Sequence, residues 1–221
     1  MNKAINVILI FVFIPTILIA IYVGMDLPIT FLKTTGEFLP YKFEIFLGLG
    51  VFMLLLLLRR SVRRWMGMRI VSQQKKFKWN APVSKTRKNR VLTYLGLEAV
   101  IMFCAGYALY EVTPEAWAPA IALLFGVVDN ILFAIIGSAA KGFRIGLSSK
   151  ALIVADREVS LLYFRGLRKV SPHQQTIYFD YIKDLQLSFP TDCIQEGKKD
   201  EFFKILEEQM DPDKVFFSKM K

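Results

Sequence analysis

The chain has 221 residues, of which 54% are hydrophobic and 19 are Phe, and it carries a formal net charge of +10. Its apolar residues stand in long uninterrupted blocks, which is incompatible with a water-facing globular surface and typical of segments in lipid. One His and two Cys exclude zinc, haem and iron–sulfur sites, so we expect no metal and no cofactor.

The positive charge is concentrated in one segment. Residues 59–90 contain twelve Lys and Arg and no acidic residue, whereas residues 91–140 carry a net charge of −4. The basicity of the protein is therefore a property of one local element.

Four apolar blocks approach the length of about 20 residues that crosses a bilayer as a helix. In chain order they predict spans at Ala4–Gly24, Phe43–Leu58, Val91–Tyr110 and Ala116–Ala140. The first block is longer than the apolar region of a signal peptide, so we interpret it as a retained span. The fold class expected for residues 1–140 is an all-α four-helix transmembrane bundle.

The distribution of Lys and Arg predicts the orientation of the bundle, because basic loops stay on the cytoplasmic side. The loop at 59–90 has twelve such residues, and the loop at 111–115 has none. We expect both termini in the cytoplasm and the protein in a bacterial inner (plasma) membrane.

The basic loop itself has two interpretations. Apolar residues recur at helical spacing between its arginines from Arg59 to Trp79, which predicts an amphipathic segment on the membrane surface, ended by Asn80-Ala81-Pro82. The residues then expected to bind anionic lipid headgroups are Arg59, Arg60, Arg63, Arg64, Arg69, Lys75 and Lys76. Alternatively the charge serves only to fix topology. Nucleic acid is not an expected partner, because nothing in this stretch predicts a fold that reads bases.

Two carboxylates lie inside predicted spans, Glu98 in the third and Asp129 in the fourth. Charges at such depth generally face protein or water. Asp129 shares a helix face with Ala118, Ala122 and Ala140, which predicts a packing seam. Three hypotheses remain open. The acids form a proton or cation relay, in which they share a proton if they meet; they dock a basic residue of a partner subunit; or they are neutral, hydrogen-bonded to Tyr94, Tyr107 or Asn130, and hold the bundle together.

Residues 141–221 have a different character and predict a small cytoplasmic α+β domain. Short runs of branched and aromatic residues predict strands, which are separated by turns that include Ser171-Pro172-His173. The expected strands are Phe143–Leu147, Ala151–Ala155, Val159–Phe164, Thr176–Phe179 and Ile182–Phe189. An amphipathic helix follows at Asp200–Met210, with Phe203, Leu206 and Met210 on its apolar face.

The order of strands followed by one amphipathic helix, together with the run TIYFDYIKDL at Thr176–Leu185, resembles bacterial pleckstrin-homology-like (PH-like) domains attached to membrane helices. The resemblance covers about 45 residues. It implies a binding or scaffolding module rather than an enzyme.

The sequence contains no phosphate loop, nucleophile elbow, zinc-protease motif or dinucleotide fingerprint, and we expect no catalytic residues. We expect a non-enzymatic accessory or scaffold subunit of a membrane complex, with a membrane-protein partner or a second copy of the chain beside it. The alternative is a proton- or ion-coupled transport component that uses Glu98 and Asp129.

Overall fold

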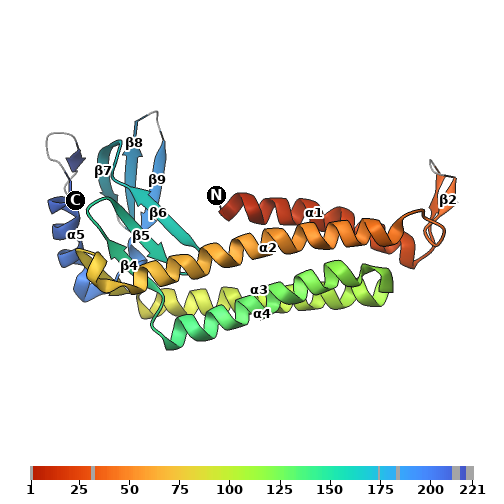
Figure 1. Cartoon of the computed structure of the whole chain (residues 1–221). Helices are drawn as coiled ribbons and strands as arrows, with labels where there is room; N and C mark the ends of the chain where they lie inside the picture. The colour runs from red at the N-terminus through yellow and green to blue at the C-terminus, as the bar shows by residue number, and fades with distance from the viewer. Residues whose placement is uncertain (1, 31–32, 174, 183–184, 211–214, 218–221) are drawn as a thin grey trace. The chain divides into compact units, whose positions relative to one another are not determined.

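The computed structural model describes residues 2–30, 33–173, 175–182, 185–210 and 215–217. The chain divides into two compact units (Figure 1), of which the first comprises Met1–Arg63 with Leu95–Ala134 and the second Arg64–Tyr94 with Ile135–Lys221. The division expected at residue 140 differs from these units, because the segment Arg64–Tyr94 belongs with the C-terminal part.

Four helices in the described chain are long and apolar enough to cross a membrane. They are α1 (Asn2–Gly24), α2 (Lys42–Ser72), α3 (Lys85–Val112) and α4 (Trp117–Ala139), the last preceded by the 3-10 turn η3 (Pro114–Ala116). A short hairpin of β1 (Pro28–Ile29) and β2 (Thr34–Thr35) lies between α1 and α2. All four predicted spans are therefore helical.

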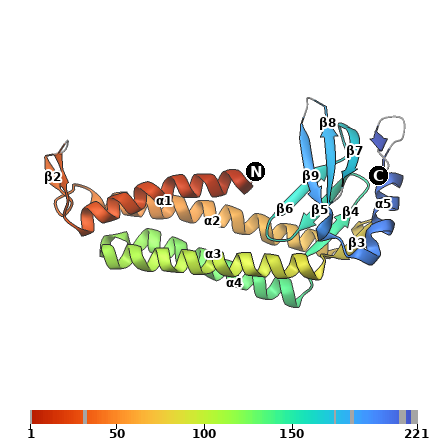
Figure 2. The same ribbon diagram turned by 180° about the vertical axis from the view of Figure 1, so that it is seen from behind.

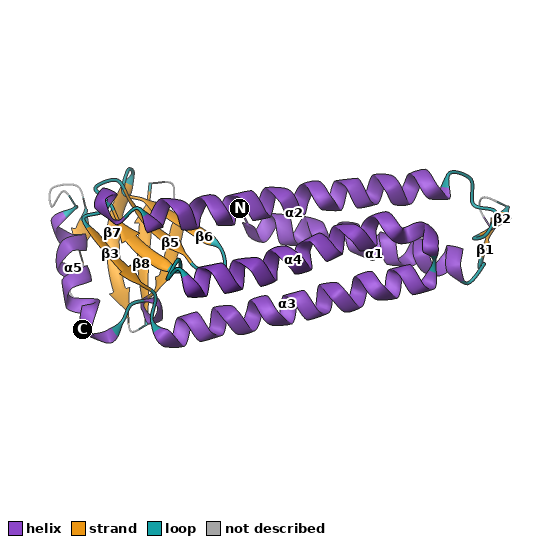
Figure 3. Cartoon of the chain, turned by 60° about the horizontal axis from the view of Figure 1, so that its bottom comes forward, coloured by secondary structure: helices purple, strands orange, loops and turns teal. Residues whose placement is uncertain are grey.

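The first unit is a helix bundle, in which α1 to α4 run side by side (Figure 3). Its core consists of small and large apolar residues in alternation, among them Ala20, Phe46, Met53, Ala122 and Leu123. Small residues allow the helices to approach closely. At Gly50, for example, a Cβ atom would lie 2.5 Å from the carbonyl carbon of Ala118, so any side chain there would separate α2 from α4.

Pro15 stands inside α1, where it removes one backbone donor. The Thr16 hydroxyl donates to the carbonyl oxygen of Val12 at 2.7 Å, one turn earlier. Such Ser and Thr contacts help membrane helices tolerate proline. The span therefore continues through Pro15.

The second predicted span ended at Leu58, but α2 continues to Ser72. At 1.5 Å per residue its 31 residues extend about 46 Å, which exceeds a hydrocarbon core of about 30 Å. Beyond Leu58 the helix buries Gly67, Met68 and Val71, and a Cβ atom on Gly67 would lie 2.0 Å from the Val159 side chain. The helical character expected from Arg59 onward is therefore present as far as Ser72, as a continuation of α2, but it does not extend to Trp79, which is a buried strand residue.

The second unit contains two four-stranded sheets, with the orders β3-β4-β5-β6 and β10-β7-β8-β9. The first comprises β3 (Trp79–Pro82), β4 (Arg144–Leu147), β5 (Ala151–Ala155) and β6 (Val159–Tyr163), all antiparallel. The second comprises β7 (Leu167–His173), β8 (Thr176–Tyr181), β9 (Gln186–Pro190) and the short β10 (Phe216–Phe217), which pairs with β7 in parallel. Short helical turns lie at η2 (Gln74–Lys76), η4 (Thr191–Cys193) and η5 (Glu196–Lys198).

Helix α5 (Lys199–Glu208) closes the second unit beside the sheets (Figure 2). Its Phe202 ring is 5.1 Å from the Trp79 ring of β3 and 5.8 Å from the Phe189 ring of β9, centroid to centroid. The buried face is Phe202, Leu206 and Met210, at i, i+4 and i+8. The choice of Phe203 for this face was wrong, since Phe203 is only half-buried. One aromatic side chain thus contacts both sheets.

Two segments expected to interrupt regular structure are strands. Asn80-Ala81-Pro82, which was expected to end the preceding helical segment, lies in β3 at the edge of its sheet, and the expected turn Ser171-Pro172-His173 ends β7. Proline is tolerated at sheet edges, where no neighbouring strand needs its N–H. The other expected strands are present with small shifts of their ends, and part of the predicted Ile182–Phe189 strand lies outside the described residues.

Candidate functional site in the helix bundle

The polar site of the bundle is built around two consecutive residues of α2. The Arg60 guanidinium forms a two-pronged ion pair with the Glu98 carboxylate of α3, in which Nη1 donates to Oε1 and Nη2 to Oε2, the latter at 2.8 Å. The Ser61 hydroxyl donates to Oδ1 of Asp129 on α4 at 2.7 Å. A single turn of α2 therefore holds the two intramembrane acids, one on each neighbouring helix.

All of these groups except Glu98 are buried. Arg60 is 3% exposed and Asp129 9%, while the Glu98 side chain is 24% exposed. A charge removed from water is tolerable only when it is paired and hydrogen-bonded. The two-pronged geometry supplies both conditions, because it engages both oxygens of Glu98 with two donors of one arginine.

The structure assigns the two acids different partners. Sequence reasoning considered that Glu98 and Asp129 meet, or that they bond to Tyr94, Tyr107 or Asn130. Glu98 is bonded to Arg60 and Asp129 to Ser61, and the Asn130 amide, which is buried, lies 4.0 Å from the Met102 sulfur. The packing seam on α4 is present, with Ala118, Ala122, Gly126 and Asp129 all buried, although Ala140 is exposed.

The basic residues predicted to bind lipid headgroups differ in their exposure. Arg59, Arg69, Lys75 and Lys76 are exposed, and Arg63 is half-buried. Arg60 and Arg64 are 3% and 1% exposed. The headgroup assignment is therefore wrong for Arg60 and Arg64, because both guanidinium groups lie inside the protein.

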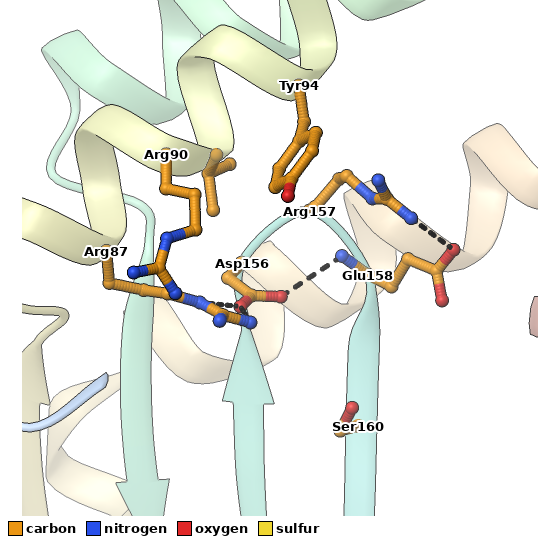
Figure 4. A pocket seen from close by; sticks show the side chains of 8 residues that line it. Arg87, Arg90, Tyr94, Asp156, Arg157, Glu158 and Ser160 are labelled. Atoms are coloured by element: carbon orange, nitrogen blue, oxygen red, sulfur yellow. Dashed lines mark hydrogen bonds and ion pairs between the residues drawn. The ribbon is translucent and has the colours of Figure 1, made fainter. Parts of the chain in front are cut away.

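A second charged cluster lies in the β-rich unit, where α3 begins (Figure 4). Arg87 donates from Nε and Nη2 to Oδ2 of Asp156, at 2.9 and 2.7 Å, and Oδ1 of Asp156 accepts the Glu158 backbone N–H at 3.2 Å. These bonds fix the turn between β5 and β6 against the first turns of α3. Beside them the Arg157 guanidinium carbon lies 5.4 Å from the centre of the exposed Tyr94 ring.

The same end of α3 is also tied to η4. Arg90 donates to Oδ2 of Asp192 at 2.9 Å. The Ser84 hydroxyl caps the helix by accepting the Arg87 N–H at 3.1 Å, and it donates to the Asp192 carbonyl at 2.6 Å. Sequence reasoning missed this cluster, because Ser84 and Asp192 are 108 positions apart and only the turn at Asp156-Arg157-Glu158 was visible as a local pattern.

His173 and Cys193 are two further titratable side chains of the β-rich unit. Within the described ranges, no group of three or more His, Cys, Asp and Glu could hold a metal ion. His173 is exposed at the end of β7, and burial raises the pKa of the Cys193 thiol to about 12. A thiol with such a pKa is protonated at neutral pH and is a poor nucleophile.

No protein-family model matches the chain, and neither a curated protein nor a solved structure matches it. The functional argument therefore depends on the geometry of the chain itself.

Proposed function

We propose that the protein is a non-enzymatic accessory or scaffold subunit of a bacterial inner-membrane complex, with its β-rich unit and both termini in the cytoplasm. The observation that carries the proposal is the pairing of the intramembrane acids within the chain. Arg60 and Ser61 engage Glu98 and Asp129, so the polar groups join three helices to one another.

The same geometry argues against the competing role in ion-coupled transport. A proton that bound Glu98 would have to displace one of two hydrogen bonds from Arg60, in a setting where an unpaired guanidinium is costly. Transport proteins also commonly have broken helices near the middle of the membrane. The helices α2, α3 and α4 are continuous over their described lengths.

For the β-rich unit we propose a PH-like binding module. Two observations support this. The consecutive antiparallel strands β4 to β6 are followed by β7 to β9 and then by α5, and strands followed by one amphipathic helix are the feature on which the resemblance to PH-like domains rests. The second observation is the packing of Phe202 of α5 against Trp79 of β3 and Phe189 of β9, which joins the helix to both sheets.

Reconstituted vesicles distinguish the two functions. Full-length protein in liposomes loaded with a pH-sensitive dye should give no proton flux beyond that of empty liposomes. The triple variant Arg60→Gln, Glu98→Gln and Asp129→Asn should still co-purify with the same membrane proteins as the unaltered chain, and Glu111→Gln, exposed at the other end of α3, is the matched control. Flux that the triple variant abolishes and the control retains would establish transport and end the scaffold proposal.

Orientation requires its own test. A reporter fused after Lys221, or inserted within residues 75–88, should report the cytoplasm, and one within residues 113–115 should report the opposite side. A C-terminal reporter active outside the cytoplasm would overturn the proposed arrangement, because it would place the twelve basic residues of 59–90 outside as well.

A further inference from the structure

An apolar cavity of about 550 Å³ lies in the second unit, between the end of α2 and the turn that follows α4. Its walls include Trp65, Met66 and Met68 from α2 and Ala140 and Gly142 from the turn, and Arg69 stands at its edge. The volume is in the range that accommodates a small molecule or part of a lipid.

The wall formed by the turn is tightly fixed. Lys141 has a positive φ of 49°, and the Gly142 N–H donates to the Gly137 carbonyl at 2.9 Å. A Cβ atom on Gly142 would lie 2.5 Å from the Met68 sulfur, so a larger residue there would require the Met68 side chain to move. The cavity is therefore a feature of the packed structure and not of a loose loop.

The cavity lies where the apolar surface of the helices ends. Ile135 and Ile136 are exposed in the last turns of α4, and Met66 and Ile70 are exposed on α2. Apolar side chains at these positions suit contact with acyl chains, and a half-buried indole such as Trp65 suits the headgroup boundary. The surface around the cavity thus has apolar side chains suited to acyl chains and an indole suited to the headgroup boundary.

The cavity has a cationic lining residue. Arg69 lines it, and the exposed Lys141 lies in the chain between the lining residues Ala140 and Gly142. None of the described lining residues is acidic. Arginine binds phosphate through paired N–H donors, so Arg69 is complementary to a phosphate group.

We propose that this cavity binds one anionic phospholipid, with part of an acyl chain against Met66 and Ala140 and the phosphate on Arg69. The site does not depend on the scaffold function. It differs from the general attraction of a basic loop to a membrane, because it has a shaped apolar wall as well as charge.

The test uses the full-length chain in a mild non-ionic detergent, titrated with dioleoyl phosphatidylglycerol and followed by native mass spectrometry. Arg69→Gln should weaken binding about five-fold, the effect of losing about 1 kcal/mol of attraction per basic residue. Ala140→Phe, which fills the cavity from an exposed position without changing charge, should weaken binding at least as much. The matched controls are Arg168→Gln on β7 and Ala139→Phe, both at exposed positions that do not line the cavity, and they should bind like the unaltered chain.

Two further ligands identify the source of the phosphate. Dioleoylglycerol, which has the same chains without phosphate, should bind at least ten-fold more weakly, and soluble glycerol 3-phosphate should not compete. If dioleoylglycerol bound as tightly as phosphatidylglycerol, Arg69 would have no role in binding a phosphate. Effective competition by glycerol 3-phosphate would show that the site takes a soluble phosphate ester. Equal loss in the variants and their controls would overturn the cavity as the binding site.

Discussion

The ion pair between Arg60 and Glu98 makes a quantitative prediction about the stability of the bundle. Arg60→Met leaves the Glu98 carboxylate without its two donors, and Glu98→Leu leaves a guanidinium that is 4% exposed without its acceptor. Breaking a buried ion pair by removing one partner costs about 3–5 kcal/mol. We expect each single variant to lose about 3 kcal/mol, near the lower end, because Glu98 is 24% exposed.

The double variant Arg60→Met/Glu98→Leu should be more stable than either single variant. It removes both charges of the pair, and replacing a buried pair with apolar side chains of similar volume is often close to neutral. The expected coupling energy is therefore at least about 2 kcal/mol, well above the error of about 0.5 kcal/mol for independent sites. The measurement is reversible unfolding in mixed micelles of dodecyl maltoside and sodium dodecyl sulfate, followed by far-ultraviolet circular dichroism.

A control pair tests whether the coupling belongs to the contact. Glu111 is exposed at the opposite end of α3, so Arg60→Met and Glu111→Leu should give additive changes in unfolding free energy. Additive costs for Arg60 and Glu98 as well would refute the reasoning. The pair would then contribute nothing to holding α2 against α3, and the structural interpretation of Glu98 would lose its support.

Three further predictions concern single side chains. Asp129→Leu should cost about 1–3 kcal/mol of unfolding free energy, because the Ser61 hydroxyl loses its acceptor. Asp129→Asn keeps an oxygen at this position and should cost less than about 1 kcal/mol. Equal costs for the two variants in the same micelle assay would contradict the assigned hydrogen bond. Phe202→Ala should lower the unfolding free energy by about 3–5 kcal/mol through the cavity it leaves, and Phe203→Ala by clearly less, which thermal denaturation of the full chain can rank. Burial raises the pKa of the Cys193 thiol from 9.0 to about 12 in the folded chain, so the thiol ionises at lower pH in the unfolded chain. The unfolding free energy, measured relative to Cys193→Ala, should therefore fall by roughly 1.4 kcal/mol per pH unit between these two values. A difference between the two chains that does not change from pH 8 to pH 11 would show that the thiol is not buried.

The existence of the four spans could be predicted because each is an apolar run of a length that only a membrane helix explains. The end of α2 could not, because it depends on contacts outside the run. Gly67 lies against Val159, 92 positions later, and this packing continues the helix through residues that composition alone assigns to a surface loop. Helix ends decided by tertiary contacts leave no signal in a local window.

The wrong assignment of Arg60 and Arg64 to lipid headgroups also follows from tertiary contacts that the local sequence does not reveal. The sequence predicts a helical segment on the membrane surface after Leu58, with all of its basic residues facing the headgroups. Once α2 continues, Arg60 and Arg64 fall on its buried side, and Arg60 meets Glu98 at a separation of 38 positions. The acids were recognised from their depth in apolar runs, but their partner was not, because it had been assigned to the headgroups.

The path of the chain through the first sheet has a consequence for folding. Strands β3 and β4 are antiparallel neighbours, with Trp79 opposite Leu147 and Pro82 opposite Arg144, yet α3 and α4 lie between them in the sequence. A flexible connection of that length would carry a substantial closure entropy. The helices remove much of it, since they form an antiparallel pair in which Gly106 of α3 approaches Ala120 and Leu123 of α4, returning the chain toward its starting point. The first sheet therefore needs residues on both sides of the helical hairpin, and a fragment of residues 141–221 alone would lack the strand that pairs with β4.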